Sequence, residues 1–200
     1  MRTMLGASAL LTPDEISPSD FSKSRHVHIE GYLLFNPDLI KAVAQSAKEA
    51  GCTISLDLAS FEVVNASKSQ LSDLLSNEVD IVFANEDEAK AYFPDIEDYE
   101  TIAKEFAKVC EIAVVKLGAD GSLVAQGDTV HRIPGNKVER AIDTTGAGDL
   151  WASGFLAGWL TGKDLPTCGA FGSLMGAEIV QIMGASIPEN RWSEILKQIQ

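Results

Sequence analysis

Residues 143–160 read DTTGAGDLWASGFLAGWL, a glycine-rich turn that runs directly into an apolar helix. Gly146 and Gly148 let the backbone turn tightly and approach a ligand without interference from a Cβ atom. The first turn of a helix presents unpaired N–H groups and the positive end of its dipole, which together bind anions. Asp149 would repel a bound phosphate, but it could act as a base or orient a hydroxyl that attacks phosphorus. A glycine-rich turn with Asp and Thr as helix caps explains the same residues without a ligand.

Short β-rich runs alternate with helical stretches upstream of this turn. Strands are expected at residues 26–34, 53–58, 79–84 and 111–117, a hairpin at 121–126 and 129–133, and helices at 37–50, 67–77, 86–93 and 99–109. Further helices are expected at 147–160, from the break at Gly162 to about Met183, and at 190–200. This order predicts one α/β domain over residues 1–200, a doubly wound, mostly parallel sheet with helices on both faces. In such sheets, ligands bind beyond the carboxyl ends of the strands.

The amino-acid composition limits the classes of partner that the chain is expected to bind. The 200 residues include 29 acidic and 16 basic side chains, a formal net charge of −13 at pH 7. Nucleic acids and anionic membranes would repel so acidic a chain, so neither is an expected partner. No apolar run approaches the roughly 20 residues of a membrane span, and the N-terminal stretch is a poor signal peptide. With three scattered cysteines, Cys52, Cys110 and Cys168, these features favour a cytoplasmic protein with reduced thiols.

Three other segments contain residues that could take part in chemistry. Asn85 and Glu88 have the spacing of a helix capping box, which by itself favours a structural role. Residues 116–121 leave a strand through a glycine-containing turn, which by itself is best interpreted as the start of a hairpin. His26 and His28 share one face of a strand and have no third ligand nearby, so a structural role is favoured over a metal site.

Several segments together resemble the PfkB-type (ribokinase-like) carbohydrate and nucleoside kinases. The turn and helix at 143–160 resemble the C-terminal signature of that family. VDIVFANEDEA at 79–89 resembles the segment with its Asn-x-x-Glu motif, VVKLGADGSLV at 114–124 its nucleotide-binding strand and turn, and HVHIEGYLL at 26–34 the strand before a helical crossover. The resemblance covers essentially all 200 residues in the family's order, and it leans toward the adenosine-kinase branch.

This resemblance implies an ATP-dependent kinase that phosphorylates a primary hydroxyl of a sugar or nucleoside, with ATP, Mg²⁺ and in some members K⁺. It implies that Asp149 is the catalytic base and that Gly146, Ala147 and Gly148 form an anion hole. The remaining matched positions bind ATP (Asn85, Lys116, Leu117, Gly118, Ala119, Asp120 and Gly121), Mg²⁺ through water (Glu88) or a monovalent cation (Asp143 and Thr145). Lys116 departs from the small hydroxyl residue that many relatives have there, and the helix around Ser173 lacks the asparagine that some place beside adenine.

Relatives in this family place a long α/β segment, a small β lid and a Gly-Gly substrate motif before the part that matches this chain. We therefore expect the chain to be the C-terminal portion of a longer kinase, without the N-terminal part and lid, and the full-length form to be a possible homodimer. The alternative is a truncated, non-catalytic fragment that binds nucleotide, because half of the acceptor pocket would be absent. A Rossmann-type dehydrogenase is a weaker alternative, since no GxGxxG follows any strand.

Overall fold

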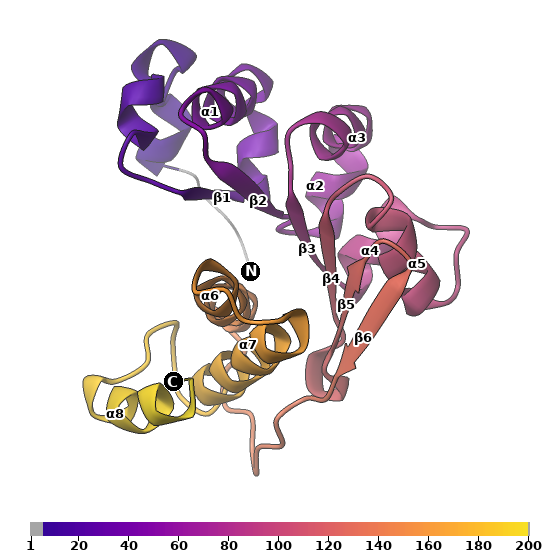
Figure 1. The fold of residues 1–200 in the computed structure, drawn as a ribbon, viewed down its shortest axis with the longest axis vertical. Helices are drawn as coiled ribbons and strands as arrows, with labels where there is room; N and C mark the ends of the chain where they lie inside the picture. Colours follow the sequence, from indigo (N-terminus) through magenta and orange to yellow (C-terminus); the bar gives the residue numbers. More distant parts are fainter. Residues whose placement is uncertain (1–5, 200) are drawn as a thin grey trace.

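The computed structural model describes residues 6–199, whose strands form one six-stranded sheet (Figure 1). Four strands are parallel and lie side by side in chain order: β1 (His26–Glu30), β2 (Thr53–Asp57), β3 (Ile81–Asn85) and β4 (Ile112–Lys116). The antiparallel hairpin of β5 (Ser122–Gln126) and β6 (Thr129–Ile133) extends the sheet beyond β4. Parallel pairing brings the carboxyl ends of β1–β4 to one edge of the sheet.

Helices cover both faces of this sheet, as predicted (Figure 1). One face carries α1 (Pro37–Glu49), α2 (Phe61–Ala66), α3 (Lys68–Asn77), α4 (Glu86–Tyr92) and α5 (Tyr99–Phe106). The other face carries α6 (Ala147–Leu160) and α7 (Leu165–Ile179), and α8 (Glu189–Gln198) packs with these two helices through a third apolar cluster. None of the helices described in residues 6–199 is long and apolar enough to span a bilayer.

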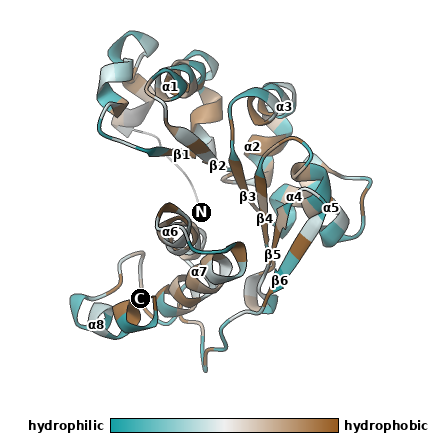
Figure 2. Cartoon of the chain, viewed as in Figure 1, coloured by the Kyte–Doolittle hydropathy of each residue, from teal (hydrophilic) through white to brown (hydrophobic). Residues whose placement is uncertain are grey.

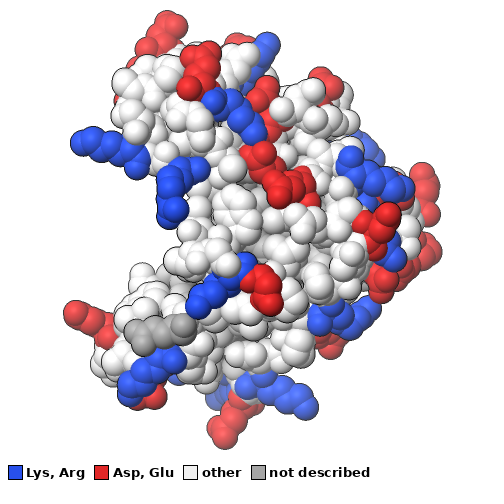
Figure 3. Space-filling view, in the orientation of Figure 1, with Lys and Arg blue, Asp and Glu red and all other residues white. Residues whose placement is uncertain are grey.

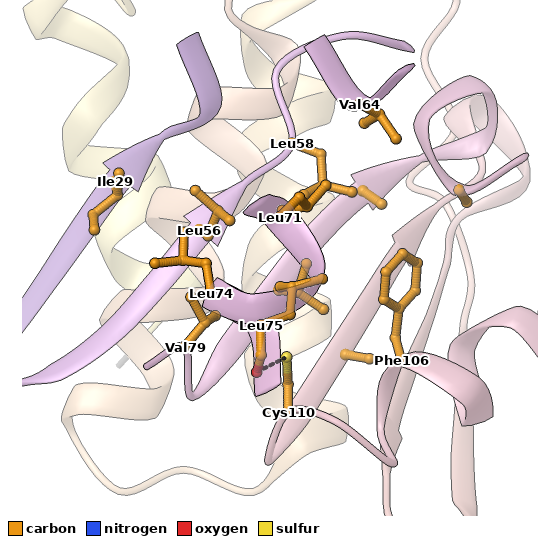
Figure 4. Close-up of a cluster of buried hydrophobic side chains, with 14 of the residues drawn as sticks. Ile29, Leu56, Leu58, Val64, Leu71, Leu74, Leu75, Val79, Phe106 and Cys110 are labelled. Atoms are coloured by element: carbon orange, nitrogen blue, oxygen red, sulfur yellow. Dashed lines mark hydrogen bonds between the residues drawn. The ribbon is translucent and has the colours of Figure 1, made fainter. Parts of the chain in front are cut away.

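The central strands are buried on both faces, which explains their continuous apolar sequences. In β3, Val82 and Ala84 pack toward α1–α5, whereas Ile81 and Phe83 pack toward α6 and α7. Figure 4 shows part of the first core, in which the Cys110 thiol donates a hydrogen bond to the Leu75 carbonyl oxygen. Hydrophobic residues are accordingly concentrated on β3 and β4 in Figure 2. All three cysteines are free and buried, as expected.

Helices α6 and α7 are in unusually close contact. A Cβ atom on Gly154 would lie 2.5 Å from the Phe171 carbonyl oxygen, and one on Gly172 would lie 2.7 Å from the Trp151 ring. Trp151 is buried and stacks on Phe155, with the two ring centroids 5.6 Å apart. Because backbone lies directly against backbone, α7 fixes the position of α6 on the sheet.

The structure differs from the sequence-based prediction mainly near the chain start. The strand expected at 26–34 ends at Glu30, and residues Gly31–Phe35 form a 3₁₀ helix. A Cβ atom on Gly31 would lie 2.5 Å from the Asp57 carbonyl oxygen, so the chain crosses the end of β2 there and leaves the sheet. The helix expected to reach Met183 ends at Ile179. The short helix α2 and three 3₁₀ turns at Gly6–Leu10, Pro13–Glu15 and Pro18–Phe21 were not predicted. The N-terminal stretch, which was interpreted as a poor signal peptide, includes residues 1–5, which lie outside the described range.

Candidate active site

Each of the four parallel strands ends in a polar or charged residue. Glu30, Asp57, Asn85 and Lys116 are the last residues of β1, β2, β3 and β4, and in the register Glu30 pairs with Asp57 and Asn85 with Lys116. The first turn of α6 lies against this edge, because Gly148 approaches the Lys116 ammonium. Figure 3 shows that the molecule is hollowed on one side, between the region of β1 and the region of α6 and α8. These features form a candidate site at the place predicted for a doubly wound sheet.

The start of α6 presents unpaired backbone donors. Gly146 is its N-cap and has a left-handed backbone with φ of 77°, and a Cβ atom there would lie 2.9 Å from the Ala185 Cβ. The N–H of Ala147 donates to the Thr144 carbonyl oxygen at 3.1 Å. The N–H groups of Gly146, Gly148 and Asp149 have no acceptor within residues 6–199. Three donors therefore remain available to an anion at this turn, and the Ala147 donor would first have to be released.

A buried ion pair lies beneath this turn. The Lys116 Nζ is 2.7 Å from the Asp57 Oδ2, and the two side chains are 12% and 10% exposed. A Cβ atom on Gly148 would lie 3.2 Å from the same ammonium, so glycine leaves room for it. Burial alone would lower the pKa of Lys116, but Asp57, followed by Glu88 and Asp149, outweighs burial and raises it. Lys116 is therefore a permanent cation.

Asn85 and Glu88 form the capping box of α4 and also face this charge cluster. The Glu88 N–H donates to the Asn85 Oδ1 at 2.9 Å, and the Asn85 N–H donates to the Glu88 Oε2 at 2.8 Å. The Asn85 side-chain amide donates to the other Glu88 oxygen at 2.7 Å. Glu88 is 2% exposed, and burial, followed by the charge of Asp57, raises its pKa to about 7. The structural role predicted for this pair is present, and it fixes a carboxyl group within the cluster.

Asp143 and Thr145 hold the turn that precedes α6. The Asp143 Oδ1 accepts hydrogen bonds from the Thr145 N–H at 2.9 Å and the Thr145 hydroxyl at 2.7 Å. The Asp143 Oδ2 accepts from the Gly184 N–H at 2.9 Å. These bonds, that from Gly184 first, lower the pKa of Asp143. The two residues thus connect the turn to the segment after α7, and the cation role implied for them remains a prediction.

The predicted nucleotide-binding turn borders the site. The Leu117 N–H donates to the Gly121 carbonyl oxygen at 2.8 Å, which closes the turn, and Gly118, Ala119 and Asp120 are exposed. Gly121 has φ of 99°, and a Cβ atom there would lie 2.0 Å from the Ile133 carbonyl oxygen. The turn is therefore held rigidly against the end of β6, and its exposed part is open to a ligand.

Two residues that sequence reasoning missed complete the carboxyl edge. Asp57 is described above, and Glu30 ends β1, where burial by surrounding protein, followed by the charges of Asp57 and Asp149, raises its pKa to about 7. Glu30 and Asp57 each end a β-rich run of the sequence. A charged residue at the end of such a run was the signal that could have identified them. Asp149 itself is exposed in the first turn of α6.

The two histidines of β1 have protein partners. His26 contacts the Thr53 hydroxyl through Nδ1 at 2.9 Å and the Ser55 hydroxyl through Nε2 at 2.8 Å. His28 contacts the same Ser55 hydroxyl through Nδ1 at 2.7 Å. Burial lowers the pKa of both rings, to about 4 for His26. Their contacts support the structural role predicted for them.

The chemistry of the site fits a phosphate more directly than a metal ion held by protein alone. No group of three or more His, Cys, Asp or Glu side chains that could hold a metal occurs among residues 6–199. A Mg²⁺ ion here would therefore depend on ligands from phosphate oxygens and water, as this ion commonly does. The unpaired N–H groups and the space left by Gly148 fit a phosphate at the start of α6.

Known proteins that are similar to this chain include kinases. The chain is 34% identical over 178 residues to an ATP-dependent ribose-1-phosphate kinase from Halopiger xanaduensis, a match that covers 86% of this chain and 54% of that protein. It is 28% identical over 205 residues to an adenosine kinase from Saccharomyces cerevisiae, covering 96% of this chain and 60% of that protein. The chain thus spans between about half and two thirds of the length of these relatives.

The fold and the sequence profile point to one family. The crystal structure of adenosine kinase from Sinorhizobium meliloti matches with a TM-score of 0.86 and 31% identity over 95% of this chain and 59% of that one. A probable sugar kinase from Rhizobium etli matches with a TM-score of 0.87 and 31% identity over 94% of this chain and 58% of that one. The profile of the pfkB family carbohydrate kinases matches residues 1–192. With the predicted signature at the start of α6, this match shows that the chain belongs to the pfkB family of carbohydrate kinases.

Proposed function

We propose that this chain carries the ATP site and the catalytic base of a kinase that phosphorylates a primary hydroxyl of a sugar or nucleoside. One observation supports it most: the unpaired N–H groups of Gly146, Gly148 and Asp149 lie beside a buried cation and a set of carboxylates at one sheet edge. Backbone donors and a cation stabilise a phosphoryl group, while a carboxylate accepts a proton from the attacking hydroxyl. The relatives named as adenosine kinase and ribose-1-phosphate kinase support the same class of acceptor.

In this proposal, Asp149 takes the proton of the acceptor hydroxyl and orients that hydroxyl toward the phosphoryl group. Its carboxylate is exposed in the first turn of α6, where an acceptor can reach it. The amides at the start of α6 stabilise negative charge on the phosphoryl group as the bond to the leaving oxygen breaks. Because the transition state of such transfers is loose, orientation by Asp149 contributes as much as early removal of the proton.

ATP and its metal ion have candidate positions around this turn. Asn85 and the turn at residues 117–121, of which residues 118–120 are exposed, would border the nucleotide, and Glu88 would hold Mg²⁺ through water. When bound, Mg²⁺ neutralises phosphate charge. Asp143 and Thr145 would bind a monovalent cation such as K⁺, which would stiffen the turn that they already hold by hydrogen bonds.

The test is turnover by the purified 200-residue chain. We expect the chain to consume MgATP with one of adenosine, ribose, ribose 1-phosphate or fructose, and ³¹P NMR of the product follows the transfer. We also expect K⁺ to raise the rate relative to Na⁺. MgATP binding by calorimetry without turnover would favour the alternative of a non-catalytic nucleotide-binding fragment. A chain that binds no MgATP would contradict both. A homodimer of the full-length form remains a prediction.

A further inference from the structure

The Lys116–Asp57 ion pair is placed to do more than stabilise the fold. Its ammonium lies at the boundary between the sheet edge and the first turn of α6, 2.7 Å from the Asp57 carboxylate and 3.2 Å from where a Gly148 Cβ would be. Gly148 is one of the residues whose N–H lacks an acceptor in the described chain. The cation and the free backbone donors thus approach the same space.

Several carboxylates surround the Lys116 cation. Asp57, Glu88 and Asp149 all act on Lys116, and Lys116 is the cation that acts in turn on Glu30 and Glu88. Without it, backbone donors alone would face several carboxylates, which repel an anion at short range. Removing the positive charge should therefore weaken phosphate binding more than the loss of one hydrogen bond would.

The hydrogen bonds show that the Asp57 carboxylate is fixed and that the Lys116 ammonium has donors left for a ligand. Both Asp57 oxygens are engaged, Oδ2 by Lys116 and Oδ1 by the Ala59 N–H at 3.0 Å. Ala59 has φ of 65°, a left-handed backbone that is unfavourable for alanine, so the loop after β2 is held in a strained form around this carboxylate. An ammonium has three donors, and Asp57 is its only acceptor among residues 6–199. Two donors of Lys116 remain for a ligand.

We propose that Lys116 contacts an oxygen of the transferring phosphoryl group and that Asp57 is a positioning residue, which holds the ammonium at the start of α6. This inference rests on the proposed function, since it names the protein-borne charge that serves the phosphate in that site. The competing explanation is a purely structural ion pair. Replacing both members of such a pair is often nearly neutral, whereas removing one leaves an uncompensated buried charge.

The test compares Lys116→Met, Asp57→Asn and the double variant in the full 200-residue chain. Binding of inorganic tripolyphosphate with Mg²⁺ is measured by calorimetry, adenosine binding serves as a ligand without phosphate, and thermal midpoints report folding. The matched control is Lys48→Met, which removes the lysine of another Lys–Asp pair, 3.0 Å apart, at the opposite end of the sheet.

We expect Lys116→Met to weaken tripolyphosphate binding by about 30-fold, the size of a charge-assisted contact, with adenosine binding unchanged. Asp57→Asn should weaken it by about 5-fold, because the ammonium remains but is no longer held. The double variant should regain thermal stability but still bind tripolyphosphate as weakly as Lys116→Met. Lys48→Met should bind as the unaltered chain does.

Two results would overturn the inference. One of them leaves the proposed function intact, and the other overturns the proposed function as well. If the double variant binds tripolyphosphate as tightly as the unaltered chain, the pair is structural and only this inference is wrong. If the unaltered chain binds neither MgATP nor tripolyphosphate, the proposed function and the inference are both wrong. If Lys116→Met does not fold, the double variant, which restores the charge balance of the pair, decides between these outcomes.

Discussion

Two Lys–Asp ion pairs lie at opposite ends of the same sheet. At the amino end, the Lys48 Nζ is 3.0 Å from both Asp80 oxygens, and Asp80 also accepts a hydrogen bond from the Ile54 N–H at 2.6 Å. At the carboxyl end, the Lys116 Nζ contacts one oxygen of Asp57 and lies beside backbone donors without acceptors. The Lys48 and Asp80 side chains are 34% and 23% exposed, against 12% and 10% for Lys116 and Asp57.

The two pairs contain the same residue types and differ in the end of the strands at which they lie. In a parallel sheet the loops and the helix starts meet beyond the carboxyl ends, so a charge placed there faces a ligand. The same residues at the amino end connect α1 to the start of β3 and have their partners within the fold.

The largest expected effect is at the carboxyl end, where Asp149→Asn should lower kcat by about 1,000-fold or more through loss of the base. Affinity for MgATP should be unchanged or tighter, because a carboxylate that repels phosphate is removed, and the thermal midpoint should not change since Asp149 is exposed. Steady-state kinetics and calorimetry measure the two quantities, with Asp73→Asn on the exposed side of α3 as control. A kcat within a few fold of the unaltered chain would rule out Asp149 as the base.

The next largest effect concerns the contact with α7 that holds α6 at the carboxyl end of the sheet. Gly172→Ala should lower the free energy of unfolding by about 3 kcal/mol, because its Cβ would meet the Trp151 ring at 2.7 Å and the Trp151 carbonyl oxygen at 2.9 Å. Gly176→Ala, one turn along α7, meets nothing closer than 3.4 Å and should be neutral or stabilising, since alanine favours helix. Urea denaturation of both variants measures the difference, and equal effects would contradict the close contact of the two helices.

A smaller effect depends on pH. The pKa of Glu88 is raised from 4.5 in the unfolded chain to about 7 in the folded one, so the folded state keeps a proton that the unfolded state releases. The stability contributed by Glu88 therefore falls as pH rises from about 4.5 to 7, by up to about 3 kcal/mol in total. Glu88→Gln should remove this fall, which urea denaturation of both proteins at several pH values would measure. Parallel curves for the two proteins would show that Glu88 ionises normally.

The smallest effect is expected at the amino end. Asp80→Asn should lower the free energy of unfolding by about 1 kcal/mol, because the pair with Lys48 is half-exposed and its hydrogen bond to Ile54 can be kept. Tripolyphosphate binding should stay within about twofold of the unaltered chain. A loss of binding as large as that of Lys116→Met would show that the two ends of the sheet do not differ in the way described.

Local patterns in the sequence predicted most of the fold and the start of the site. Apolar runs identified all six strands, and glycines in DTTGAGD identified the turn that Gly146 makes before α6. The helix α2 was missed because its six residues are too few to show helical periodicity. The Lys116–Asp57 pair was missed because it joins residues 59 positions apart. The order of the strands in the sheet determines which charged strand ends lie side by side. The periodicity of one segment contains no information about which strand becomes its neighbour in the sheet.

The bond between Asp143 and Gly184 also determines when the site is complete. The turn before α6 is held by Gly184, Gly146 packs against Ala185, and Leu150 packs in the apolar cluster that includes Trp192 of α8. A ribosome makes these partners after the whole sheet has been synthesised. We therefore expect the sheet to form during synthesis and the turn before α6 to be fixed only after α8 has been released, so that a nascent chain stalled before α8 has a core but an incomplete turn.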